Sequence, residues 1–91
     1  MADGPKWELF VGHKAERTLR RLPRDVRQRL RAAIDSLAVD PRPLGCLKLV
    51  SSETLYRIRV GDWRIIYAIE DDRLAILIVN VTPRGGAYRN L

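Results

Sequence analysis

The chain has 91 residues, of which 46% are hydrophobic and 31% charged, and this composition fits one folded domain over residues 1–91. Seventeen Lys and Arg against eleven Asp and Glu give a net charge of +6 and a pI near 10.2. That excess indicates a polyanionic partner, such as nucleic acid, an anionic membrane surface or an acidic protein. A basic surface that serves only solubility is the alternative.

Cysteine usage and hydropathy exclude several classes of protein. The single cysteine, Cys46, excludes an internal disulfide and a multi-cysteine zinc site, and it is typical of the reducing cytoplasm. The longest apolar run, Leu74–Val79, is far shorter than the roughly 20 residues that a membrane-spanning helix needs. We therefore expect a cytoplasmic protein without a transmembrane segment.

The spacing of apolar residues changes half-way along the chain. In the first half they recur every three or four residues, which predicts two helices separated by Pro23 and stopped at Asp40–Pro43. In the second half they alternate with period two between Gly and Asp turns, which is typical of strands. The expected elements are a strand over Trp7–Val11, helices over Lys14–Leu22 and Arg24–Ala38, and strands over Gly45–Val50, Thr54–Val60, Trp63–Glu70 and Arg73–Thr82.

This order predicts an α+β domain, in which the N-terminal strand and a helical hairpin pack on an antiparallel β-meander. The last strand is apolar on both faces, so we expect it at an interior position of the sheet.

The turn Gly61-Asp62 sets the register of the hairpin between the second and third strands of the meander. Arg59 then faces Arg64, and Tyr56 faces Tyr67. One face of the hairpin is apolar and suits a core: Tyr56, Ile58, Val60, Trp63, Ile65 and Tyr67. The opposite face carries three arginines, which we call the arginine platform: Arg57, Arg59 and Arg64.

Arginines that face each other on neighbouring strands repel, so stability alone does not favour the arginine platform. Guanidinium groups bind phosphate through two parallel hydrogen bonds, which indicates an anion-binding surface. The alternative is that these arginines pair with carboxylates such as Glu70 or Asp72 on a solvated face.

Other residues are candidates to join the platform. Lys48 lies on the preceding strand, while Arg84, Tyr88 and Arg89 follow the last one. Tyr88 either caps the open end of the core or acts on RNA, by stacking on a base or by accepting or donating a proton.

His13 is the single histidine, and metal-ligand spacing is absent, so we expect neither a metal nor a cofactor. RNA supplies its own nucleophile, the 2′-OH, so charge and positioning suffice to cleave it.

The segment Tyr56–Tyr67, with the sequence YRIRVGDWRIIY, closely resembles the signature of the RelE/ParE toxin superfamily. Asp40–Leu49 looks like that family's entry to its sheet, and the resemblance extends from about Trp7 to Arg89. It implies a microbial-RNase-like fold and a toxin–antitoxin pair. In the RelE branch, it implies a toxin that enters the ribosomal A site and cuts mRNA through the 2′-OH, leaving a cyclic phosphate and a 5′-OH.

The same resemblance assigns roles to single residues. Arg64 matches the key catalytic arginine, and Arg84 and Tyr88 match the arginine after the last strand and the C-terminal tyrosine that activates the 2′-OH. Gly85-Gly86 departs from a more charged stretch of the family, which affects how Tyr88 is aimed. The expected phosphate-binding residues are Lys48, Arg57, Arg59 and Arg89.

Two other functions stay open: a ParE-like, non-enzymatic inhibitor of DNA gyrase, and a basic RNA-binding module without activity.

The resemblance implies an antitoxin partner with an acidic or amphipathic segment, which docks as a helix in a groove or as an added strand. The second helix also carries arginines that either form a solvated face or contact ribosomal RNA: Arg24, Arg27, Arg29 and Arg31.

Overall fold

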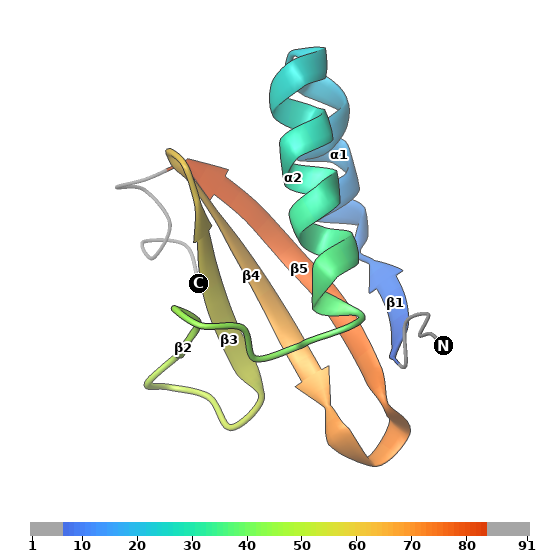
Figure 1. Cartoon of the computed structure of the whole chain (residues 1–91), viewed down its shortest axis with the longest axis vertical. Coiled ribbons are helices and arrows are strands. Elements are labelled where there is room, and N and C mark those ends of the chain that lie inside the picture. The colour runs from blue at the N-terminus through green and yellow to red at the C-terminus, as the bar shows by residue number, and fades with distance from the viewer. Residues whose placement is uncertain (1–6, 84–91) are drawn as a thin grey trace.

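The computed structural model describes residues 7–83, in which two helices lie on one face of a five-stranded sheet (Figure 1). The strand order is β1-β5-β4-β3-β2. This α+β architecture confirms the predicted fold class. The elements are β1 (Glu8–Val11), α1 (His13–Arg21), α2 (Arg24–Leu37), β2 (Leu47–Lys48), β3 (Leu55–Val60), β4 (Trp63–Glu70) and β5 (Ala75–Pro83).

Strands β2 to β5 form the predicted antiparallel meander, and β5 is interior, as its apolar sequence indicated. The pairing of the first strand, β1, was not predicted from the sequence. β1 pairs in parallel with β5, with Glu8 opposite Ala75 and Val11 opposite Ile78, so the sheet is mixed. Parallel neighbours need a long crossover between them, and here all the other elements lie between the two strands in sequence.

β2 and β5 each begin two residues later than predicted, because the backbone turns just before them. Only Leu47–Lys48 of the expected Gly45–Val50 strand pairs with β3; Gly45 has a φ of 94° just before it. β5 begins at Ala75 rather than Arg73, because a turn of 3-10 helix over Asp71–Arg73 ends at Leu74 in the left-handed conformation, with a φ of 52°.

The core lies between the helices and the face of the sheet that they cover. α1 packs against β5, and α2 extends across to β3. The helical residues of this core are at most 1% exposed: Ala15, Leu19, Leu30, Ile34 and Leu37. The predicted apolar face of the β3–β4 hairpin also belongs to the core or packs against it. Burial of each Leu or Ile side chain in this core contributes about 1.5–3 kcal/mol.

The loop after α2 crosses the sheet and is held there by two tyrosines and an ion pair. The Tyr67 hydroxyl donates to the carbonyl of Pro41 at 2.7 Å, and burial raises the pKa of Tyr67. Arg42 donates to both carboxylate oxygens of Asp71, at 2.9 and 3.2 Å, and its Nε donates to Tyr56 Oη at 3.3 Å. These contacts hold the loop before β2 against β3 and the β4–β5 turn.

Substitution of Tyr67 by Phe tests whether this buried hydrogen bond holds the loop. We expect a loss of about 1–3 kcal/mol in the free energy of unfolding, because the Pro41 carbonyl loses its buried partner. Urea denaturation measures this loss. Tyr56→Phe is the matched control, and it should cost less because its bond to Arg42 is exposed. Equal losses in the two variants would contradict the assignment.

The Arg42–Asp71 pair predicts a dependence of stability on pH. The Arg42 guanidinium lowers the pKa of the Asp71 carboxyl below its ordinary value of 3.8. A lowered pKa in the folded state means that the pair stabilises the protein above about pH 4, and that this contribution is lost as pH falls through the lowered pKa. Asp71→Asn should therefore reduce the melting temperature at neutral pH, and the difference from the parent should close in acid. A difference that is the same at every pH would rule out this contribution.

Candidate nucleic-acid interface

The β3–β4 hairpin has the predicted register, and it brings the three residues of the arginine platform together. Arg59 pairs with Arg64 across the hairpin, and Arg57 lies opposite Ile66. Arg59 is exposed, whereas Arg57 and Arg64 are half-buried. The three side chains extend from the face of the sheet opposite the helices, because their neighbours in each strand point into the core.

The turn that creates this register depends on Gly61. Its φ of 60° lies in the left-handed region that favours glycine. A Cβ at this position would also lie 2.6 Å from Nη2 of Arg29 on α2. Gly61 therefore fixes the pairing of Arg59 with Arg64, and a Cβ there would also require the end of the Arg29 side chain to move.

One alternative for the arginines was a pairing with Glu70 or Asp72. Arg64 and Glu70 lie near opposite ends of β4, about 20 Å apart at the usual rise of about 3.3 Å per residue. Asp72 lies further still, in the turn after β4. These carboxylates are too distant to neutralise Arg64 and its partner Arg59.

A β-bulge places polar groups of β5 beside the platform. The register of β4 and β5 shifts between Ile66 and Tyr67, so that Val79 is an extra residue in β5. As a result Asn80 lies opposite Ile66 and Thr82 opposite Arg64, while Val81 enters the core. Without the bulge this alternation would be reversed, with Val81 beside Arg64.

Asn80 and Thr82 are polar residues of this surface that sequence reasoning missed. Asn80 is 5% exposed, and its Oδ1 accepts a hydrogen bond from the N–H of Val81 at 3.0 Å. Thr82 Oγ1 is buried and has no hydrogen-bond partner among residues 7–83. The available signal was an asparagine within an otherwise apolar strand, because asparagine is depleted in regular strands.

The structure does not bring Lys48 together with the arginine platform. Lys48 lies opposite Tyr56, whose ring belongs to the face covered by the helices, whereas Leu47 lies opposite Arg57. The Lys48 ammonium is 3.9 Å from the carboxylate of Glu53, and both are exposed. Lys48 therefore lies at the β2 edge, on the other side of the sheet.

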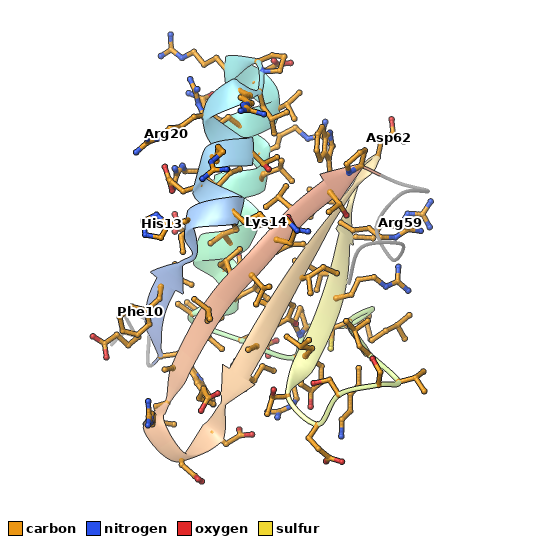
Figure 2. All side chains as sticks on the ribbon, turned by 180° about the vertical axis from the view of Figure 1, so that it is seen from behind. Phe10, His13, Lys14, Arg20, Arg59 and Asp62 are labelled. Atoms are coloured by element: carbon orange, nitrogen blue, oxygen red, sulfur yellow. The ribbon has the colours of Figure 1, made fainter. Side chains whose placement is uncertain are left out.

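The remaining candidates differ in their location. Arg84, Tyr88 and Arg89 lie outside the described residues. His13 is exposed at the start of α1, on the opposite side of the molecule from Arg59 (Figure 2).

Within residues 7–83, no group of three or more His, Cys, Asp and Glu side chains is placed to hold a metal ion. No helix in that range is long and apolar enough to cross a membrane.

The platform therefore offers fixed positive charge beside a buried hydroxyl group. Arginine stays charged at any working pH, so these residues hold anions and stabilise developing negative charge rather than transfer protons. Phosphate groups along a nucleic-acid strand match these properties.

A family model described as the ParE toxin of the type II toxin–antitoxin system parDE matches residues 10–88. The chain belongs to the ParE toxin family. The toxin RelE of Mycobacterium tuberculosis is 29% identical to this family member over 90 residues, which cover 98% of this chain and 93% of that protein. Sequence comparison thus confirms the RelE/ParE superfamily.

Solved structures agree with this assignment. The RelE–RelB complex from Pyrococcus horikoshii contains a chain that is 29% identical and has a TM-score of 0.78, covering 89% of this chain and 98% of that one. The isolated RelE toxin of E. coli has a TM-score of 0.75 at 20% identity, with 90% and 88% of the two chains covered, and so shares the fold. This ParE-family chain is a type II toxin with the fold of RelE.

Thr82→Val tests whether the buried hydroxyl group of Thr82 takes part in binding. The Thr82 hydroxyl group forms no hydrogen bond with residues 7–83, so its removal should leave the free energy of unfolding unchanged or slightly higher. Affinity for a single-stranded RNA oligonucleotide should fall by about tenfold if a bound phosphate completes this hydrogen bond. Fluorescence anisotropy measures the affinity, and Thr54→Val, at an exposed position before β3, is the control. Unchanged affinity would show that the Thr82 hydroxyl group does not contact the RNA.

Proposed function

We propose that this toxin is an mRNA endonuclease of the RelE type, which cuts mRNA in the ribosomal A site and thereby stops translation. The observation that carries the proposal is the pairing of Arg59 with Arg64, next to Arg57, on the face of the sheet that the helices leave uncovered. The similarity to the M. tuberculosis RelE toxin over nearly the whole chain supports it.

In the proposed reaction, the 2′-oxygen of one nucleotide attacks the adjacent phosphorus and the bond from phosphorus to the 5′-oxygen breaks. The products are a cyclic phosphate and a 5′-OH. The 2′-OH loses a proton and the leaving oxygen gains one, and we assign these two proton transfers to protein side chains rather than to a metal ion. Arg64 stabilises the additional negative charge on the phosphate, while Arg57 and Arg59 hold it and its neighbours.

The other proposed roles belong to four residues outside the arginine platform. Tyr88 assists in removing the proton from the 2′-OH, and Arg84 stabilises the leaving group. Arg89 and Lys48 bind phosphates further along the RNA, with Lys48 at the β2 edge. We further propose that the protein acts in the cytoplasm and is held inactive by a cognate antitoxin, as the toxin in the P. horikoshii RelE–RelB complex is bound to RelB.

Inhibition of DNA gyrase without catalysis is the second candidate. It is favoured by one observation, which is that the matching family model describes ParE toxins. The two functions have different consequences in cells, because inhibited gyrase induces DNA-damage signalling whereas mRNA cleavage halts translation directly.

Arg64→Ala and Tyr88→Phe test the proposed nuclease. Each should reduce the rate of mRNA cleavage in a purified translation system by about 10²–10³, because each removes a group that acts on the transition state. Primer extension measures the cleavage. Arg73→Ala, at an exposed arginine in the β4–β5 turn, is the control and should cleave normally. Unchanged cleavage in both test variants would refute the site, and DNA-damage signalling by a toxin that leaves mRNA intact would favour gyrase.

A further inference from the structure

A small pocket, which we call the tip pocket, lies where α2 meets the tip of the β3–β4 hairpin. Its volume is about 120 Å³, well below the roughly 300–1,000 Å³ of pockets that enclose a whole small-molecule ligand, so it suits a single ring system. Three residues of α2 and three of the hairpin line it: Val26, Arg29, Leu30, Val60, Asp62 and Trp63.

The tip pocket adjoins the arginine platform at the end of the hairpin. The next pair beyond Arg59 and Arg64 in the register is Val60 with Trp63, and both of these residues line the pocket. Their side chains pack against the core, so the pocket lies on the helix side of the sheet while the platform lies on the other side. Figure 2 shows Asp62 at the hairpin tip and Arg59 at the same end of the molecule.

The wall of the tip pocket is apolar and includes an aromatic ring. Leu30 is 1% exposed, whereas Val26, Val60 and Trp63 are half-buried. An indole ring provides a flat surface on which a base can stack, and the aliphatic side chains exclude water around it. This wall suits the flat, apolar face of a base better than a sugar or a phosphate group.

Two opposite charges line the same pocket without neutralising each other. Arg29 and Asp62 are both exposed. The Arg29 guanidinium lies against the turn, since its Nη2 would be 2.6 Å from a Cβ at Gly61, the residue before Asp62. Among the described residues, neither charged side chain forms a salt bridge. The pocket therefore presents a guanidinium that can donate and a carboxylate that can accept hydrogen bonds from a ligand.

Guanine is the base that can satisfy both charged groups at once. Its N1–H and N2–H donors are adjacent, so one carboxylate can accept from both, and its O6 and N7 are adjacent acceptors for a guanidinium. Adenine, cytosine and uracil each have only one donor group on the Watson–Crick edge. With these bases the carboxylate would lose one of its two hydrogen bonds, which is the basis of selection against them.

We propose that the tip pocket binds a guanine base of the RNA strand whose phosphates lie on the arginine platform. Trp63 stacks on the base, Asp62 accepts from N1–H and N2–H, and Arg29 donates to O6 and N7. A single strand can bend around the hairpin tip in this way, because its bases are free to splay apart. This inference rests on the proposed function and adds to it a preference for guanine near the cut.

A substitution of Asp62 tests the pocket, because overall charge and base recognition have opposite effects there. Asp62→Asn removes a negative charge, which by itself strengthens the binding of any RNA, and it keeps a Gly-Asn pair that suits a hairpin turn. Asp72→Asn is the matched control, since it removes the same charge in the turn after β4. The probes are two labelled RNA pentamers, UUGUU and UUAUU, and fluorescence anisotropy measures their affinity for the full chain.

We expect the parent protein to bind UUGUU about tenfold more tightly than UUAUU. Asp62→Asn should reduce this preference to about twofold or less, because asparagine cannot accept from both guanine donors, and Asp72→Asn should keep it. Arg29→Gln should also reduce the preference, whereas Arg20→Gln on α1 should not. Thermal unfolding shows whether each variant folds. Equal affinity of the parent for the two pentamers, or an unchanged preference in Asp62→Asn, would overturn the proposal.

Failure of this inference can be told apart from failure of the proposed nuclease, because the binding measurement needs neither a ribosome nor cleavage. Arg64→Ala should weaken the binding of both pentamers alike and keep their ratio. A protein that cuts mRNA but binds both pentamers equally would refute the guanine pocket alone. A guanine preference that depends on Asp62, in a protein that leaves mRNA intact, would refute the nuclease and support the pocket.

Discussion

The register of the β3–β4 hairpin is the constraint on which the rest of the structure depends. Side chains alternate between the faces of a strand, so one register assigns every residue of both strands to a face. With Val60 opposite Trp63, Ile58 and Ile65 enter the core while Arg59 and Arg64 remain outside it. A slip of one residue in either strand would move its arginines towards the helices. The core and the platform are therefore determined together by the turn at Gly61.

This coupling explains how the molecule tolerates two arginines facing each other. Their repulsion costs a fraction of a kcal/mol to about 1 kcal/mol, whereas each aliphatic residue buried on the opposite face contributes about 1.5–3 kcal/mol. Because the same strands carry both faces, the guanidinium groups are anchored on one of the best-packed parts of the fold. A charged site supported in this way is organised before its ligand arrives, which lowers the cost of binding.

The sequence was sufficient to predict features that depend on neighbouring residues. Helical and strand periodicity placed the elements, and the Gly61-Asp62 turn gave the hairpin register pair by pair. Features that depend on distant residues were not predictable from local patterns. The parallel pairing of β1 with β5 joins the two ends of the described chain, and the bulge at Val79 depends on how β5 packs on β4. Lys48 was misplaced relative to the platform because β2 pairs through only two residues, whose register no turn signal fixes.

The pairing of β1 with β5 also governs when the protein becomes complete during its own synthesis. Glu8 pairs with Ala75, so β1 cannot pair within the sheet until β5, its partner strand, has been synthesised. α1 packs against β5 as well, and it lacks this support until that strand has been made. A nascent chain that has reached only β4 thus has its arginines but not the scaffold that positions them. For a toxin, this late assembly means that the platform is not positioned until β5 has been made.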